Sequence, residues 1–177
     1  MNQTGGDNLW LKIELARFLD YSSLCKEGTS TLVLVMGGVA VGKTRFRRER
    51  YSHGYVVLDA GEIFLNLSKG QYFDFPSVLE DQMQRIGSEL AYQALSERRH
   101  IVCELIGDEQ EGTKAMMKAA ESMGYKIEVR GLTCDIEVAL ERNRARSIDN
   151  ISAHFTQRYH MQWFTEAAAR ISLDNAP

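Results

Sequence analysis

The feature that constrains the fold most is a glycine-rich octapeptide, GGVAVGKT, which follows directly on the apolar run TLVLVM. The octapeptide matches the pattern G-x-x-x-x-G-K-[ST] at Gly37, Gly42, Lys43 and Thr44 without a mismatch. Glycines let the backbone turn tightly and bring consecutive N–H groups against phosphate oxygens, and a following helix directs the positive end of its dipole at the same anion. A glycine-rich turn with a surface lysine is the alternative, but the apolar strand before it and the helix after it favour a phosphate-binding loop.

This loop predicts a nucleotide-binding site. We expect Lys43 to reach the β- and γ-phosphates of ATP or GTP, and Thr44 to offer its hydroxyl to Mg²⁺. The helix after the loop, KTRFRRERY, also carries four arginines, but Glu49 interrupts them and favours a solvated helix face over a substrate-binding patch. The predicted ATP-binding residues are Gly37, Gly38, Val39, Ala40, Val41, Gly42, Lys43, Thr44 and Arg45.

Apolar runs typical of buried strands alternate with helical patterns along the rest of the chain. The strands are expected at residues 31–36, 55–59, 100–105 and 126–132. The helices are expected at about residues 8–22, 76–97, 111–124, 135–146 and 151–169, with a short final strand at 170–173. This alternation predicts an α/β three-layer sandwich with a mainly parallel sheet. With the phosphate loop, it indicates a P-loop NTPase fold of the kinase type, as one domain with its core at about residues 31–173.

The size and composition of the chain narrow its function class. Its 177 residues suffice for one domain with a real core. A net charge of −3 gives little electrostatic attraction for a polyanion, so nucleic acid is the less favoured partner. The three widely spaced cysteines predict buried thiols rather than a metal site or a disulfide framework. The start of the chain lacks a signal-peptide pattern and no apolar run is long enough to span a bilayer, so a cytoplasmic location with no membrane contact is expected.

Three acidic residues follow predicted strands and are candidates for catalysis. In an open parallel sheet, functional groups gather beyond the carboxyl ends of the strands. Asp59 or Glu62 is the candidate general base for an acceptor hydroxyl, although Asp59 is equally well explained as the N-cap of the next helix. Glu104 or Asp59 is expected to hold Mg²⁺, through its water shell, or the acceptor. For Glu104, a strand-end glutamate in a solvated loop is the alternative.

Two arginines on the helix predicted at residues 135–146 are candidates for binding charge. Arg142 and Arg146 are four residues apart and share a helix face, whereas Arg144 points elsewhere. We expect them to neutralise the charge that develops on the phosphates in the transition state. The alternative is a salt-bridged helix surface with Glu137 and Glu141.

Four segments in order resemble the P-loop kinase group that contains the zeta toxins and the small AAA-type domains of polynucleotide kinases. The resemblance covers residues 31–160, and its segments are VLVMGGVAVGKT, YVVLDAGEIF, RRHIVCELIG and ESMGYKIEVRGLTCDIEVALERNRAR. It implies ATP- and Mg²⁺-dependent phosphorylation of a nucleotide sugar such as UDP-N-acetylglucosamine. It also implies an antitoxin partner, which many systems of this group have.

The resemblance also has departures. A gap-free match puts Gly61 where the family has its catalytic aspartate, and a one-residue shift brings in Glu62 instead. Glu104 matches the strand-end glutamate of zeta toxins, but LIGDEQ replaces the family's glycine-threonine-arginine continuation. Arg142 matches the arginine on the late helix, and the segment ALERNRAR is closer to the polynucleotide kinases, where it belongs to the lid.

The leading hypothesis is therefore a kinase that moves the γ-phosphate of ATP to a hydroxyl of a small molecule, with a nucleotide sugar as one candidate acceptor. Its predicted catalytic residues are Lys43, Asp59, Glu62, Glu104, Arg142 and Arg146. A nucleoside kinase or a nucleic-acid 5′-end kinase is the alternative of the same class. A nucleotide-binding ATPase or switch without a separate acceptor is the alternative of another class, and the glycine at position 61 favours it.

Overall fold

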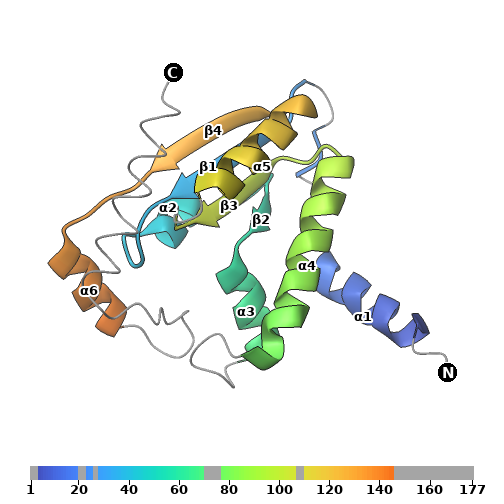
Figure 1. Ribbon diagram of the computed structural model, residues 1–177, viewed down its shortest axis with the longest axis horizontal. Helices are drawn as coiled ribbons and strands as arrows, with labels where there is room; N and C mark the ends of the chain where they lie inside the picture. Colours follow the sequence, from blue (N-terminus) through green and yellow to red (C-terminus); the bar gives the residue numbers. More distant parts are fainter. Residues whose placement is uncertain (1–3, 20–22, 26–27, 70–76, 107–109, 146–177) are drawn as a thin grey trace.

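The computed structural model describes residues 4–19, 23–25, 28–69, 77–106 and 110–145. Within them, strands and helices form the expected three-layer α/β sandwich (Figure 1). The helix predicted at residues 151–169, the strand at 170–173 and the side chain of Arg146 lie outside the described residues. No helix in the described ranges is long and apolar enough to cross a membrane.

The centre of the described structure is a parallel sheet of four strands in the order β2-β3-β1-β4. The strands are β1 (Thr31–Met36), β2 (Val56–Leu58), β3 (Ile101–Leu105) and β4 (Lys126–Gly131), each within two residues of its predicted bounds. Met36, the last residue of β1, pairs with Leu105 of β3 and Gly131 of β4. The carboxyl ends of three strands therefore meet at one edge, where the groups that follow them come together.

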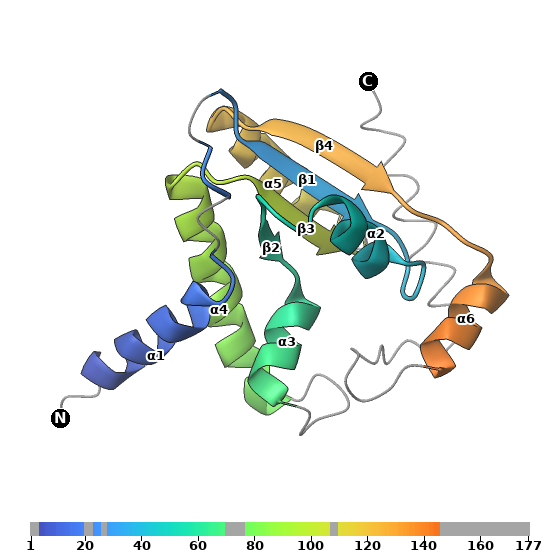
Figure 2. The ribbon, with the colours of Figure 1, turned by 180° about the vertical axis from the view of Figure 1, so that it is seen from behind.

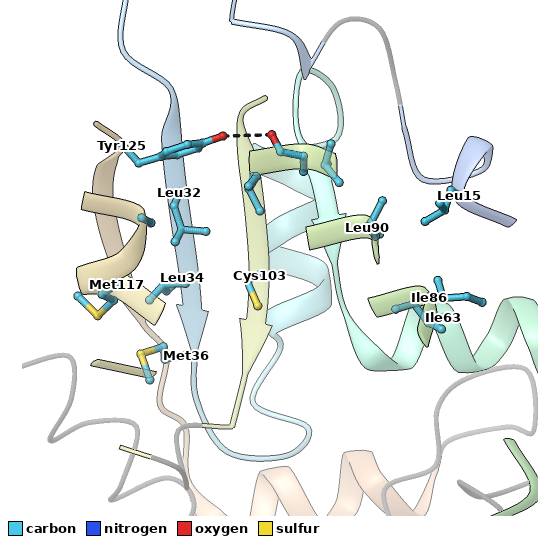
Figure 3. Close-up of a cluster of buried hydrophobic side chains, with 14 residues drawn as sticks. Leu15, Leu32, Leu34, Met36, Ile63, Ile86, Leu90, Cys103, Met117 and Tyr125 are labelled. Carbon is cyan, nitrogen blue, oxygen red and sulfur yellow. Dashed lines mark hydrogen bonds between the residues drawn. The ribbon is translucent and has the colours of Figure 1, made fainter. Parts of the chain in front are cut away.

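The alternation of side chains along β1 divides the core into two layers. Leu32, Leu34 and Met36 face the helices α4 (Ser77–Ser96) and α5 (Gln110–Ser122), as Figure 3 shows for part of this cluster. Val33 and Val35 face the opposite side, where α2 (Lys43–Arg50) covers the sheet through Phe46. Figure 2 shows α2 in front of the sheet and α5 behind it. Both faces of β1 are buried, which explains its continuous apolar sequence.

Two further helices pack against α4, and one of them departs from its predicted bounds. Helix α1 spans Thr4–Ala16 instead of residues 8–22, because the chain turns at its end, where the Phe18 N–H donates to Leu15 O at 3.0 Å. Helix α3 (Ala60–Ser68) follows β2 and packs on α4. The hydroxyl of Tyr125 donates to Ala94 O at 3.2 Å and joins the start of β4 to the end of α4 (Figure 3).

The last described helix, α6 (Ile136–Arg144), lies at the carboxyl end of the sheet (Figures 1 and 2). Asp135 caps it, because its Oδ1 accepts from Glu137 N at 2.8 Å, as the sequence predicts. Buried Ala139 and Leu140 pack against Val39 and Ala40 of the glycine-rich loop. The helix is thus attached directly to the predicted phosphate-binding loop.

Candidate active site

The glycine-rich loop connects β1 to α2 and has a backbone that tolerates few side chains. Gly42, the N-cap of α2, has a φ of +109°, a value that favours glycine. A Cβ added to Gly37 would lie 2.5 Å from Leu132 O and 2.8 Å from Val41 Cγ2. The first glycine of the motif is therefore required by the close approach of the chain that leaves β4.

Lys43 places its ammonium over this loop. Its Nζ donates to Gly37 O and Gly38 O, each at 2.8 Å. Lys43 is also the first residue of α2, so the ammonium and the positive end of the helix dipole occupy the same place. A cation at the start of this helix, above a glycine-rich loop, suits a bound triphosphate.

Thr44 and Arg47 lie three residues apart on one face of α2, and both bind Glu104 at the end of β3. The hydroxyl of Thr44 donates to Oε2 of Glu104 at 2.9 Å, and Nε of Arg47 donates to Oε1 at 2.5 Å. A hydroxyl and a carboxylate side by side are oxygen ligands of the kind that Mg²⁺ uses. The described residues contain no group of three or more His, Cys, Asp or Glu placed to hold a metal ion. The pair formed by Thr44 and Glu104 suits Mg²⁺, which takes most of its ligands from phosphates and water.

Arg47 is the largest difference between the site and the sequence prediction. Its side chain is only 6% exposed, although the arginines of this helix were expected on a solvated face. Besides Glu104, its Nη2 binds Glu62 Oε1 at 2.6 Å and lies 3.7 Å from Asp59 Oδ2. Burial alone lowers the pKa of Arg47, but its bonds to Glu104 and Glu62 outweigh burial and raise the pKa above the ordinary value. One buried guanidinium therefore holds three carboxylates from different elements.

The other arginines of α2 match the prediction of a solvated face. Arg45, which was also predicted to bind ATP, is exposed and pairs with Glu49 at 2.8 Å. Arg48 is exposed and donates to Glu62 at 2.9 Å. Arg50 is exposed and its guanidinium lies 5.4 Å from the centre of the Phe46 ring.

Asp59 uses its two carboxylate oxygens differently. Oδ1 accepts from Gly61 N at 2.9 Å and caps α3, so the capping interpretation is confirmed. Oδ2 is buried and accepts no hydrogen bond from the described residues. Burial, followed by the nearby charge of Glu104, raises the pKa of Asp59 to about 6. Asp59 thus caps a helix and still has one oxygen available to take a proton.

Glu62 lies in a different environment from Asp59. Burial by itself raises the pKa of Glu62, but hydrogen bonds from Arg48 and Arg47 outweigh it and hold the pKa below the usual value. Two arginines therefore stabilise its charged form, and a proton binds weakly there. Of the two acids considered as the base, Asp59 has the more suitable chemistry.

A cavity of about 680 Å³ opens between α3, α4 and the carboxyl ends of β2 and β3. Its walls are Leu58, Asp59, Ala60, Ile63, Ser77, Glu80, Met83, Gln84, Gly87, Ser88, Ala91, Cys103, Glu104 and Leu105. The side formed by α4 is a stripe of residues three or four positions apart, which are polar or small except for Met83. The sequence analysis did not identify this stripe. Its polar residues, at positions 77, 80, 84 and 88, are spaced three or four apart next to the buried stripe of Ile86 and Leu90, and this spacing could have indicated it.

The thiol of Cys103 is buried, as predicted for these cysteines, whereas Cys25 and Cys134 are only half-buried. Burial raises the pKa of Cys103 to about 12. A thiol with so high a pKa is a poor nucleophile, so Cys103 contributes shape rather than reactivity to the cavity.

The arginines of α6 are exposed. They are Arg142 and Arg144, and both lie in the last turn of the helix. Because α6 packs on the glycine-rich loop, Arg142 is carried by a helix that borders the nucleotide site. Arg146 lies outside the described residues.

Comparison with solved structures shows a shared fold at low sequence identity. The AvrRxo1-ORF1:AvrRxo1-ORF2 complex with ATP superposes with a TM-score of 0.66 and 14% identity, over 94% of this chain and 57% of that one. The PezAT chromosomal toxin–antitoxin system of Streptococcus pneumoniae gives a TM-score of 0.62 and 16% identity, over 81% and 64%. The Pnkp1/Rnl/Hen1 RNA repair complex gives 0.60 and 13%, over 85% and 48%. The chain thus spans less than two thirds of each of these relatives.

Comparison with curated proteins finds no match. The match to a protein family, in contrast, extends over most of the chain and includes the phosphate loop, all the acids of the site and α6. The zeta toxin profile matches residues 17–173, and the chain therefore belongs to the zeta toxin family.

Proposed function

We propose that the chain is an ATP- and Mg²⁺-dependent kinase that transfers the γ-phosphate to a hydroxyl of a small molecule bound between α3 and α4. The observation that carries the proposal is the position of Glu104. Its carboxylate lines the cavity and also accepts the hydroxyl of Thr44 from the phosphate loop. A nucleotide on the loop and an acceptor in the cavity would meet at this residue. Family membership and the fold shared with a structure solved with ATP support the proposal.

On the nucleotide side, the chain supplies cations and ligands for the metal. The ammonium of Lys43, now bonded to Gly37 O and Gly38 O, would turn to the β- and γ-phosphates of ATP or GTP. Thr44 would bind Mg²⁺ directly and Glu104 through its water shell, and Mg²⁺ would neutralise charge on the transferred phosphate. Arg142 and Arg146 are the proposed cations at the far side of the phosphates.

On the acceptor side, Asp59 is the proposed general base. Its Oδ2 is buried and free of hydrogen bonds from the described residues, and Asp59 is one of the residues that line the cavity. A hydroxyl placed against this oxygen would lose its proton there as its own oxygen attacks the γ-phosphate. Glu62 is held by Arg47 and Arg48, so we assign it the structural role of positioning Arg47.

A protein inhibitor is proposed as a partner. Two of the similar structures are a complex of two AvrRxo1 reading-frame products and a toxin–antitoxin system. We infer by this likeness that the chain acts on cytoplasmic ATP and is restrained by an antitoxin. Co-purification of the chain with the product of an adjacent gene would test this partner.

The observation that favours the ATPase alternative is Gly61, which stands where the family has an acid. The cavity favours the kinase, because a hydrolytic switch needs no such volume next to its base. Incubation with γ-labelled ATP, Mg²⁺ and a panel of nucleosides, nucleotide sugars and 5′-hydroxyl oligonucleotides separates the two. Label in a panel member supports the kinase, and label only in inorganic phosphate supports the ATPase.

The Lys43→Ala variant is the control for the nucleotide site. A charge-assisted hydrogen bond contributes about 1.5–3 kcal/mol, so ATP affinity should fall roughly 10- to 150-fold. Isothermal titration with a non-hydrolysable ATP analogue measures this change. Unchanged affinity together with unchanged turnover would contradict the role given to the lysine.

A further inference from the structure

The wall of the cavity that α4 provides carries four exposed polar residues next to Met83, Gly87 and Ala91. Ser77, Glu80, Gln84 and Ser88 line the cavity along one helix stripe, and Nε2 of Gln84 donates to the Ser88 hydroxyl at 3.3 Å. The buried residues of the same helix, such as Ile86 and Leu90, pack into the core instead. Carboxylate, amide and hydroxyl groups at this spacing suit hydrogen bonds to hydroxyl and amino groups of a ligand.

The opposite wall and the floor of the cavity are apolar around Asp59, the proposed general base. Leu58 and Ile63 come from the β2–α3 segment and Leu105 from the end of β3. Apolar walls with a few placed polar groups are typical of sites for small molecules, and about 680 Å³ is the size of a site for a ligand as large as a nucleoside. The cavity therefore has apolar surface on the β2–α3 side and polar groups for a ligand's substituents on α4.

The charged residues among the described lining of the cavity all have the same sign. Among its described lining residues are three carboxylates, those of Asp59, Glu80 and Glu104, and no lysine, arginine or histidine. The buried cation next to the cavity is Arg47, and its single positive charge is shared among Glu104, Glu62 and Asp59, so it does not balance their charges. The exposed Arg48 binds Glu62. A phosphate placed in this cavity would face an excess of negative charge from the described residues, which disfavours its binding.

From this distribution we infer that the acceptor is an uncharged or positively charged, hydroxyl-bearing molecule of the size of a nucleoside or an aminosugar, which lies in the cavity and carries no phosphate. This inference rests on the proposed kinase activity and narrows its acceptor. It distinguishes this chain from an enzyme that holds the diphosphate of a nucleotide sugar between these helices.

The proposed step is balanced by groups that the proposal names. The acceptor O–H bond breaks and its proton goes to Oδ2 of Asp59. The acceptor oxygen forms a bond to the γ-phosphorus, the bond from that phosphorus to the β-bridging oxygen breaks, and ADP leaves with both electrons of that bond. The product is a phosphate monoester of the acceptor, which is anionic and is therefore repelled by the same carboxylates. Charge would thus favour product release.

The test separates acceptors by charge before any is identified. A cellular small-molecule extract is divided by anion exchange into a flow-through fraction and a retained fraction, and each is incubated with the protein, γ-labelled ATP and Mg²⁺. The expected result is at least tenfold more label in compounds of the flow-through fraction. Label mainly in compounds of the retained fraction, or in neither fraction while ATP is still hydrolysed, overturns the inference.

A matched pair of variants on α4 tests the same point by adding a cation. Gln84 lines the cavity, whereas Gln82 is exposed on the same helix and is not part of the wall. Gln84→Lys should raise the share of label in retained, anionic compounds at least threefold, and Gln82→Lys should leave that share unchanged. An equal response of the two variants overturns the inference.

The Lys43→Ala variant keeps this outcome apart from that of the proposed function. If the wild-type protein neither binds nor hydrolyses ATP, the kinase proposal itself fails. If it transfers label in a Lys43-dependent way but only to anionic compounds, the kinase stands and the charge inference alone is wrong.

Discussion

Helices α2 and α4 approach the same end of the sheet but contribute opposite chemistry. The inward residues of α2 are donors that already have partners: Lys43 binds loop carbonyls, while Thr44 and Arg47 bind Glu104. The residues that α4 turns to the cavity, Glu80 and Gln84 among them, are acidic or neutral. The α2 side is arranged to bind anions before any ligand arrives, and the α4 side has a charge that disfavours anions. Asp59 lies between the two, bordering both the cavity and Arg47.

The largest effect is expected at this boundary. Asp59→Asn keeps an N-cap for α3 but removes the basic oxygen, so phosphoryl transfer should fall about 10²- to 10⁴-fold with ATP affinity retained. Glu62→Gln is the matched control and should lose much less turnover. Steady-state kinetics with ATP titration measures both. Equal losses in the two variants would remove the distinction between the acid on the cavity side and the acid held by arginines.

The next effect tests whether the α2 side is held by buried charge. Arg47→Met leaves Glu104 and Glu62 without their buried cation, so the free energy of unfolding should fall by about 3–5 kcal/mol. Arg45→Met removes an exposed arginine from the same helix and should cause no measurable change. Chemical denaturation of the two variants gives the comparison. If both behave alike, α2 owes its position to apolar packing alone.

A smaller effect concerns pH. A base with a pKa of about 6 must be deprotonated, so turnover should fall about tenfold per pH unit below 6 and level off above it. Because the folded-state pKa lies above the ordinary 3.8, Asp59 favours folding below about pH 4, and about 3 kcal/mol of that contribution is lost as pH rises to 6. Rate and unfolding profiles from pH 4 to 8 should show both trends, and Asp59→Asn should remove the stability trend.

The smallest effect is expected on the α4 side. A Cβ at Gly87 would lie 3.7 Å from Ile63 Cδ1, an ordinary contact, so Gly87→Ala should raise the free energy of unfolding by about 1 kcal/mol through helix propensity. The same methyl narrows the cavity and should raise KM for the acceptor while leaving ATP affinity unchanged. A change in ATP affinity instead would show that the two sides are not separable.

The part of the site that the sequence predicts well is the part encoded by neighbouring residues. The loop from Gly37 to Thr44 is a contiguous motif, and its strand and helix follow from the adjacent apolar and helical patterns. Asp59 and Glu104 were found because the carboxyl ends of parallel strands must meet at one edge. The order of those strands was not predictable, since pairing depends on contacts between residues far apart in the sequence.

What the sequence could not show depends on which way side chains face. Arg47 stands among three other arginines, and only the packing of α2 on the sheet decides that Arg47 is buried and Arg45 is exposed. The choice between Asp59 and Glu62 depends on how closely an arginine approaches each acid, since Arg47 Nη2 lies 2.6 Å from Glu62 Oε1 but 3.7 Å from Asp59 Oδ2. The polar stripe of α4 has the period of any solvated helix face, and only the position of α3 makes it a cavity wall.

The central place of β1 in the sheet has a consequence for how the protein is made. This strand is translated well before its neighbours β3 and β4, which are encoded far downstream. At typical synthesis rates of about 5–20 residues per second, the nascent strand waits for seconds before either partner exists. Gly37 meets Leu132 only after β4 has been translated. A chain translated only as far as β3 should therefore be unable to bind ATP, and nucleotide affinity should appear only after β4 has been translated.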